Sequence, residues 1–258
     1  MPKHLSIYPW AMDSEPAERL RNAVSKRLGY KVMKLYGHKG NYDVVSRGEA
    51  VVNWGRSDRP DWYKEGLHWL NHPDVIINSV DKLRSFECFK EAGVHHVPFS
   101  TEMEWARSWA RKGAWIACRQ DTKSYDGKGL VLAKTLNQIV DAPLYTRFID
   151  GIAEFRAYVF RGKCIDLLKK FSEKGGANPH IRTDANGWNY TYNFHAAPEG
   201  YEKPAIKAIK SCGLDFGGVD LLWDGEEWWV LEVNTAPDIN YNAVELFADG
   251  VVDWLQAL

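Results

Sequence analysis

Two short segments near the C-terminal end of the sequence constrain its fold more than any other feature. Gly217-Gly218-Val219-Asp220 is followed by Glu232-Val233-Asn234. Asp220, Glu232 and Asn234 all offer oxygen atoms, the donors that suit Mg²⁺ or Mn²⁺. Because Mg²⁺ is usually held by one or two carboxylates together with nucleotide phosphates, the pattern predicts a nucleotide as well as a metal. The alternative is an ordinary hairpin with acidic residues on its surface.

The residues between the two segments predict how the hairpin pairs. Side chains alternate along a strand, so Glu232 and Asn234 should share a face with Trp228 and Val230, while the odd-numbered residues face a core. Asp224-Gly225 is a turn signal. A three-residue loop over 223–225 would pair even-numbered with even-numbered positions. We therefore predict an odd-length loop that sets Asp220 diagonally across from Glu232.

Length and composition bound the class of protein. The chain has 258 residues, 45% of them hydrophobic, which suffices for two small domains or one elaborated domain. A net charge of −1 gives no global basic excess for binding nucleic acid or membranes. The four cysteines are far apart and predict no disulfide framework, which favours a reduced, cytoplasmic setting. No signal peptide or membrane span is expected.

The segment from Leu231 to Pro237, together with Asp220, resembles the metal-binding end of the ATP-grasp superfamily. The most similar branch is that of the ribosomal-protein S6 glutamate ligases, including small ATP-grasp proteins of tailed phages. Gly218 supports this branch, because D-alanine–D-alanine ligases carry an arginine there. Pro237-Asp238 departs from the common Pro-Gly and puts the following loop in doubt. The resemblance covers residues 80–258 and implies an α/β (α+β) chain with a nucleotide between two β-rich subdomains.

Three parts are expected along the chain. Residues 1–79 open with a strand, a helix and a strand, which predicts a small N-terminal α/β domain. The resemblance implies ATP-grasp subdomain A with a glycine-rich lid over 80–144, and subdomain B with the metal site over 145–258. The last helix should break near Asp249-Gly250. Strands are expected at 5–10, 31–35, 51–54, 115–119, 130–133, 145–149, 154–160, 163–168, 216–222 and 228–234. Helices are expected at 15–28, 81–92, 102–111, 204–212 and 243–258. A short helix or turn is expected at 136–140, and an exposed loop at 174–188.

The resemblance also implies which residues hold ATP. Lys82, in Asp81-Lys82-Leu83-Arg84-Ser85, would reach a phosphate. Arg119 stands where the family usually has a lysine, so the charge is kept but becomes a planar fork. The loop containing Ser124, Gly127 and Gly129 resembles the flexible lid over the phosphates, and an ordinary β-turn is the alternative.

Residues 145–149 resemble the hinge strand whose backbone contacts adenine, and Asp150 could bind the ribose hydroxyls. A half-buried strand with no ligand is the alternative. The predicted hinge contacts are Thr146, Arg147, Phe148 and Ile149.

Two further segments resemble catalytic strands of the glutamate-ligase branch. Arg156 would point at a substrate carboxylate or at the transferred phosphate, although Glu154 and Arg156 share a face and could simply pair. Lys169-Lys170 lies where the family has a basic residue near the γ-phosphate. Alternation allows only one of these lysines to face the site, and we favour Lys169.

Substrate contacts are expected in two places. His180 and Arg182 lie in a loop that resembles one bordering the acceptor pocket in phage-type members, and they could bind an acidic substrate. The alternative is a solvated polar loop. Arg56 lies beside Gly55 at a strand end, where open α/β sheets place ligands.

These features together predict an ATP-dependent carboxylate–amine ligase that forms an acyl-phosphate and releases ADP and phosphate. No protein nucleophile is needed, which fits the absence of a Ser/His/Asp set. The alternatives are a kinase that phosphorylates a hydroxyl and a non-catalytic ATP-dependent binding module. The partners would be a small-molecule acid and amine, or a macromolecular acceptor such as a protein or a modified nucleobase. A monomer or a homodimer is expected, in a host cytoplasm if the chain is phage-encoded.

Overall fold

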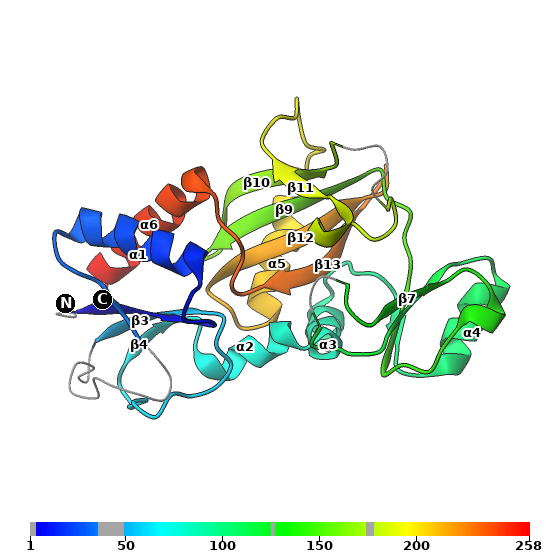
Figure 1. Ribbon diagram of the computed structural model, residues 1–258, viewed down its shortest axis with the longest axis horizontal. Helices are drawn as coiled ribbons and strands as arrows, with labels where there is room; N and C mark the ends of the chain where they lie inside the picture. Colours follow the sequence, from blue (N-terminus) through cyan, green and yellow to red (C-terminus); the bar gives the residue numbers. More distant parts are fainter. Residues whose placement is uncertain (1–3, 36–48, 125–126, 174–177) are drawn as a thin grey trace.

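The computed structural model of the protein describes residues 4–35, 49–124, 127–173 and 178–258. Its strands form three sheets that follow one another along the long axis of the molecule, with helices packed against them (Figure 1). This mixed α/β architecture is the predicted fold class. Within the described ranges, none of the helices combines the length and apolar character that a membrane crossing requires.

The first sheet is parallel throughout, in the order β2-β1-β3-β4. Helix α1 (Glu15–Leu28) begins after Ser14, whose side chain accepts a hydrogen bond from the backbone N–H of Ala17, and ends at Gly29 in the left-handed conformation. Both predicted ends of this helix are therefore confirmed. The strands are β1 (Leu5–Pro9), β2 (Met33–Lys34), β3 (Ala50–Trp54) and β4 (His68–Leu70).

The last helix closes the core of this first sheet. Helix α6 (Tyr241–Gln256) lies beside α1 in Figure 1, and its Phe247 packs in one hydrophobic cluster with Leu5 of β1 and Phe160 of the central sheet. The predicted break near Gly250 is wrong, because the helix is continuous. Glycine is needed there for close packing, since a Cβ would come within 2.8 Å of the Phe160 ring.

The central sheet is antiparallel, in the order β11-β10-β9-β12-β13. Its strands are β9 (Ala153–Phe160), β10 (Lys163–Phe171), β11 (Asn189–Thr191), β12 (Phe216–Trp223) and β13 (Trp228–Asn234). A second hydrophobic cluster fills the space between one face of this sheet and three helices. These helices are α2 (Pro73–Val80), α3 (Lys82–Ala92) and α5 (Glu202–Ser211). The opposite face is partly polar.

The third sheet is also antiparallel, in the order β5-β8-β6-β7, and packs against helix α4 (Met103–Arg111). Strand β8 pairs with β5 and β6, so the proposed boundary between residues 144 and 145 falls at the start of this strand. The division into three domains remains a prediction. The strands are β5 (Phe99–Ser100), β6 (Ile116–Arg119), β7 (Leu130–Ala133) and β8 (Leu144–Arg147), and the 3₁₀ turn η1 spans Leu136–Gln138.

Four short elements escape the sequence analysis: β4, α2, β5 and β11. The three strands have only two or three residues each, and α2 has only eight, so the pattern carries little signal. Strand β11 and the 3₁₀ turn η2 (Asp184–Asn186) lie in or just after the segment expected to be an exposed loop, part of which is outside the described residues.

The β12–β13 hairpin places Asp220 opposite Glu232 through a β-bulge and not through the length of its loop. The last pair is Trp223 with Trp228, which leaves an even-length loop, so the predicted odd-length loop is wrong. The register shifts between Asp220 and Leu221 instead, where Leu231 is the extra residue of a β-bulge.

The bulge also changes which side chains share a face. Val230 and Val233 both belong to the core under the sheet, whereas Glu232 lies on the face of Asp220. The predicted sharing of a face by Glu232 and Val230 is therefore wrong. Asp220 lies directly opposite Glu232 rather than diagonally across from it.

Replacing Gly250 with alanine tests the contact between α6 and the central sheet. Helix propensity favours alanine by about 1 kcal/mol, but overpacking costs about 1–3 kcal/mol. We expect Gly250→Ala to lower the free energy of unfolding in urea, and Phe160→Leu to restore part of the loss. Gln256→Ala, at an exposed position of the same helix, should change the free energy by about 0.5 kcal/mol or less. A more stable Gly250→Ala protein would contradict this packing.

Candidate functional site

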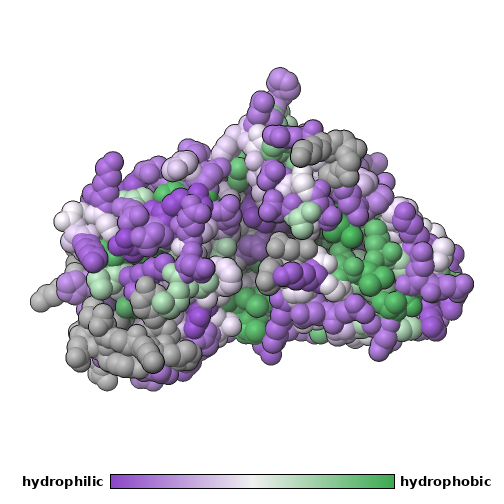
Figure 2. Space-filling view, viewed as in Figure 1, coloured by the Kyte–Doolittle hydropathy of each residue, from purple (hydrophilic) through white to green (hydrophobic). Residues whose placement is uncertain are grey.

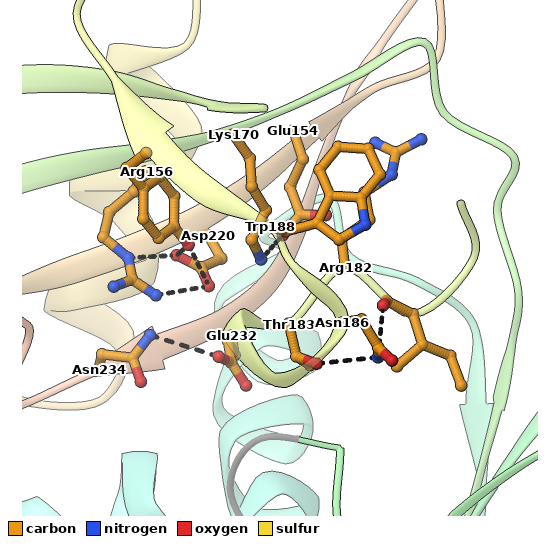
Figure 3. A network of polar contacts seen from close by, with 12 residues as sticks. Glu154, Arg156, Lys170, Arg182, Thr183, Asn186, Trp188, Asp220, Glu232 and Asn234 are labelled. Atoms are coloured by element: carbon orange, nitrogen blue, oxygen red, sulfur yellow. Dashed lines mark hydrogen bonds and ion pairs between the residues drawn. The ribbon is translucent and has the colours of Figure 1, made fainter. Parts of the chain in front are cut away.

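A row of polar side chains crosses one face of the central sheet (Figure 3). In the strand register Asp220 lies opposite Arg156 on one side and Glu232 on the other, and Lys170 lies opposite Tyr190. Residues directly opposite one another in a sheet point to the same face. All five strands therefore contribute to one site, and the predicted Arg156, Asp220 and Glu232 are brought together.

Arg156 and Asp220 form a buried bidentate ion pair at the centre of the row. Arg156 Nε and Nη2 donate to Asp220 Oδ1 and Oδ2 at 2.6 and 2.9 Å. The side chains are 13% and 5% exposed. Burial opposes the charge of Arg156, but the carboxylate of Asp220 outweighs it and raises the pKa of Arg156 well above its ordinary value. The guanidinium is thus a fixed positive charge.

Glu154 pairs with Lys170 rather than with Arg156, so the simple pairing considered for those two residues is wrong. Lys170 Nζ donates to Glu154 Oε1, and both side chains are buried. Burial raises the pKa of Glu154, although Lys170 acts in the opposite direction. Lys169 lies opposite Phe155, which belongs to the core under the sheet. The preference for Lys169 is therefore wrong, and Lys170 is the lysine of this site.

Glu232 lies among positive charges at the end of the row. Lys82, the first residue of α3, places its Nζ 3.8 Å from Glu232 Oε2 and donates to the Ser124 carbonyl oxygen at 2.5 Å. Asn234 Nδ2 donates to Glu232 Oε1 at 3.3 Å. Burial would raise the pKa of Glu232, but Lys82, followed by Arg156 and Arg119, holds it well below the usual range. Glu232 is therefore ionised at neutral pH.

A narrow cleft of about 130 Å³ lies between this row and the third sheet. Figure 2 shows apolar side chains gathered over the part of the molecule that contains β7, and β7 contributes Leu130 and Leu132 to the cleft. Leu222 and Leu231, which the sequence analysis does not single out, line it from the central sheet. The predicted residues that line it are Arg119, Thr146, Arg147, Phe148, Ile149, His180 and Arg182.

Arg119 lines this cleft with one guanidinium nitrogen unsatisfied in the described part of the chain. Its Nε is buried and has no hydrogen-bond partner among the residues that the structure describes. Burial lowers the pKa of Arg119, and the charge of Glu232 acts in the opposite direction. A buried guanidinium nitrogen without an acceptor is suited to an anionic ligand.

The hinge separates this cleft from a wider hollow of about 760 Å³. The exposed Asp150 lines the hollow, and the rings of Trp115 and Phe148 stack in its wall with centroids 5.8 Å apart. The larger cavity therefore lies beside the hinge and away from the charged row. Asp150 lines this hollow and not the narrow cleft, and its contact with a ribose remains a prediction.

The loop before β11 closes over the cleft. The ring of His180 lies edge-on to Trp115 and Phe148, with centroids 4.6 and 5.6 Å apart. Arg182 Nη2 donates to the Gly151 carbonyl oxygen at 2.8 Å. The structure thus places His180 and Arg182 beside the hinge, where a nucleotide is expected, and not in a fully solvated loop. A contact of these residues with an acidic substrate remains a prediction.

The predicted lid lies next to the same loop. Gly127 and Gly129 have φ of +70° and +66°, values that favour glycine. A Cβ on Gly127 would lie 3.3 Å from Ile181 Cγ2, so the lid and the loop before β11 are in contact. Tyr125 and Asp126 lie outside the described residues.

Arg56 is held by residues of the first sheet. Its Nη2 donates to Asp58 Oδ2 at 3.0 Å and its Nη1 to the Trp10 carbonyl oxygen at 3.1 Å. Gly55 nevertheless abuts the segment after β13, because a Cβ there would lie 2.7 Å from Ala236 Cβ. The end of β3 therefore borders the site, while the guanidinium of Arg56 is not joined to the polar row.

The oxygen donors of the row fit a hard divalent cation. Asp220 and Glu232 lie directly opposite each other. Asn234 turns its amide nitrogen to Glu232, so the side-chain carbonyl oxygen of Asn234 remains available as a metal ligand. A carboxylate has about four lone-pair sites, so Asp220 can accept from Arg156 and still bind a cation. Within the described ranges, no three His, Cys, Asp or Glu side chains form a metal-binding group. Asn234 and ligand oxygens would complete the set.

Tyr190 is a member of the row that the sequence analysis misses. Its hydroxyl lies 3.4 Å from both carboxylate oxygens of Asp220. Asn189-Tyr190-Thr191-Tyr192 has the aromatic and β-branched alternation of a strand, and this signal could have found it.

Known sequences similar to this chain include probable glutamate ligases. No protein-family model matches the chain. A probable alpha-L-glutamate ligase of Pseudoalteromonas translucida is 26% identical over 219 residues, which cover 78% of this chain and 70% of that protein. A probable alpha-L-glutamate ligase of Maridesulfovibrio salexigens is 26% identical over 227 residues, which cover 81% and 72%.

Solved structures show the same fold. The ATP-grasp ligase PsnB, complexed with a minimal precursor, aligns with a TM-score of 0.70 at 11% identity over 98% of this chain and 99% of its own. D-alanyl-alanine synthetase A from Vibrio cholerae aligns with a TM-score of 0.64 at 14% identity over 100% and 98%. The fold of this chain is therefore that of the ATP-grasp ligases to which it is similar.

The sequence relatives confirm the resemblance to the S6 glutamate ligase-like branch of ATP-grasp proteins. Gly218 agrees with this assignment. A Cβ at Gly218 would lie 3.1 Å from Pro237 Cβ and 3.3 Å from Arg156 Cδ, so a larger residue there would require these neighbours to shift.

Removal of Lys170 should leave a buried, uncompensated charge on Glu154. We expect Lys170→Met to raise the pKa of Glu154 further and to lower the free energy of unfolding by about 3–5 kcal/mol near neutral pH. Because the folded-state pKa then lies above the unfolded one, stability is kept below the ordinary glutamate pKa and lost as pH rises through the folded value. Urea denaturation across this pH range measures the loss.

Two variants make this prediction specific. Adding Glu154→Gln to Lys170→Met should recover most of the stability at neutral pH, because no buried charge remains. Lys169→Met, on the opposite face of the same strand, should cost about 0.5 kcal/mol or less. Equal losses from Lys169→Met and Lys170→Met would contradict the assignment of faces.

Proposed function

We propose that this protein is an ATP-dependent carboxylate–amine ligase that forms an acyl-phosphate and releases ADP and phosphate. The observation that carries the proposal is the polar row itself. Two carboxylates and an amide oxygen lie on one sheet face among cationic side chains, next to a cleft bordered by the hinge. The kinase and the non-catalytic binder are not favoured, because the sequence relatives and similar structures are named as ligases.

The cleft would hold the nucleotide. The backbone of residues 146–149 lies along its hinge side and would contact adenine, with Leu222 and Leu231 against the base. Asp150 would bind the ribose. Arg119 and Lys82 would meet the phosphates, because both are cationic and both lie close enough to Glu232 to lower its pKa. Ser124, Gly127 and Gly129 would cover the phosphates from the lid.

Asp220, Glu232 and Asn234 would hold Mg²⁺, which supplies neutralisation of phosphate charge. Similarity to a structure of PsnB complexed with its precursor, Mg and ADP supports this use of the site. The ionised state of Glu232 and the lone pairs that Asp220 retains beside Arg156 suit both carboxylates to this role.

Phosphoryl transfer would proceed by alignment and charge stabilisation. The substrate carboxylate oxygen attacks the γ-phosphorus and ADP leaves; the amine nitrogen then attacks the acyl carbon and phosphate leaves. Arg156 and Lys170 would stabilise the negative charge that develops on the transferred group and on the tetrahedral intermediate. Neither step requires a covalent bond to the protein.

The substrates follow from the relatives only as classes. The two relatives compared above are named as probable alpha-L-glutamate ligases, and several similar structures contain precursor peptides. We propose an amino acid as one substrate and a small acid or a peptide as the other, with His180, Arg182 or Arg56 near a substrate carboxylate.

Measurement of ADP release from Mg-ATP tests the proposal. We expect release to require both an acid and an amine, with glutamate and short peptides in the substrate pools. Glu232→Ala should reduce it on the order of 100-fold or more, because a metal ligand supports several kcal/mol of charge stabilisation. Glu91→Ala, an exposed acid on α3, is the control. Hydroxylamine should trap an acyl-phosphate as a hydroxamate; phosphorylation of a hydroxyl with no trapped product would identify a kinase instead.

Arg119 provides an independent test of the nucleotide cleft. A hydrogen bond to a charged group contributes about 1.5–3 kcal/mol, so Arg119→Ala should weaken ATP binding by on the order of 10-fold or more. Arg119→Lys should lose less, because the charge is kept. Tryptophan fluorescence titration measures both. Arg111→Ala, an exposed change on α4, should leave affinity unchanged. Equal affinities for Arg119→Ala and Arg111→Ala would remove Arg119 from the site.

A further inference from the structure

Tyr190 contacts three charged side chains of the row, those of Arg156, Lys170 and Asp220. Strand β11 sets it opposite Lys170, at the edge of the central sheet. Arg156 Cζ lies 4.5 Å from the centroid of its ring and Lys170 Nζ lies 5.3 Å from it. Both distances are within the range of a cation–π interaction. One aromatic ring therefore contacts the two cations proposed to act on the transferred group.

The contacts of Tyr190 and Asp220 together fix the orientation of the Arg156 guanidinium. Asp220 binds the edge formed by Nε and Nη2, and the ring of Tyr190 contacts the group over its face. The Tyr190 hydroxyl also donates to Asp220, which links the ring to the carboxylate. A guanidinium has five N–H donors, so three remain after the bidentate pair. Two of these three, one on Nη1 and one on Nη2, lie along the Nη1–Nη2 edge that Asp220 does not bind, and the third points from Nη1 toward the Cδ side.

We infer that Tyr190 is a positioning residue that presents the free edge of Arg156 to the anion formed during acyl transfer. The inference rests on the proposed function, because it needs an anionic group to pass this edge. Electrostatic stabilisation depends on donors that are already in place when charge develops. A misplacement of about 1 Å can cost on the order of 100-fold in rate. Tyr190 limits the rotation of the guanidinium about the axis that the bidentate pair leaves free.

Substitutions at Tyr190 separate its ring from its hydroxyl. We expect Tyr190→Leu to lower kcat on the order of 10-fold with little change in the KM for ATP, because the aromatic face is lost. Tyr190→Phe keeps the ring and should lose distinctly less. Tyr30→Leu is the matched control, since Tyr30 is also half-buried but packs at the end of α1. If Tyr190→Leu does not fold, Tyr190→Met fills similar volume without a π-face.

A double-mutant cycle shows whether Tyr190 acts through Arg156. If it does, Tyr190→Leu should lower kcat much less in an Arg156→Lys background than in the wild type. Additive losses in kcat, or a loss equal to that of Tyr30→Leu, would overturn the inference.

A second readout does not depend on activity. The Arg156 Nε–H signal in NMR, assigned by its disappearance in Arg156→Lys, should exchange slowly with water in the wild type and in Tyr190→Phe. It should exchange much faster in Tyr190→Leu. Absence of ADP release from the wild type would count against the proposed function alone, whereas unchanged exchange in Tyr190→Leu would overturn the role of Tyr190.

Discussion

The site depends on a single extra residue in one strand. Leu231 forms a bulge in β13, and the bulge reverses the alternation of side chains at that point. Val230 can therefore remain in the core while Glu232, two residues later, faces the polar side with Asp220. Without the bulge, either the hydrophobic contacts of β13 or the pairing of the two carboxylates would be lost. Core packing and ligand placement are reconciled by this local irregularity.

A balance of charge holds the polar row together. Two buried ion pairs, Arg156 with Asp220 and Lys170 with Glu154, lie on this sheet face, and within each pair the opposite charges neutralise one another. Glu232 and Arg119 are less closely matched: Lys82 Nζ lies 3.8 Å from Glu232 Oε2, and the Arg119 Nε has no partner in the part of the chain that the structure describes. Paired groups at the centre provide rigidity, and the unmatched groups at the margin are those suited to a charged ligand.

Sequence reasoning succeeds where the signal is local and fails where it depends on the assembled sheet. The caps of α1, most strand positions and the residues Asp220, Glu232 and Arg156 follow from turn chemistry, alternation and motif. The hairpin loop and the choice between Lys169 and Lys170 could not be predicted, because both depend on register across neighbouring strands. Tyr190 was missed although its segment carries a short strand alternation, and Gly250 suggested a break because its packing partner, Phe160, is distant in sequence.

The position of α6 has a consequence for how the chain matures. Leu5 is the first residue of β1. Its side chain packs in one hydrophobic cluster with Phe247 of α6, which is more than 200 residues later in the sequence. A chain emerging from the ribosome therefore carries an incompletely covered parallel sheet until Tyr241–Gln256 has been made. The contacts that complete this core are among the most distant in sequence, and such contacts form slowly. Until α6 packs against it, part of the apolar surface of the first sheet is therefore left uncovered.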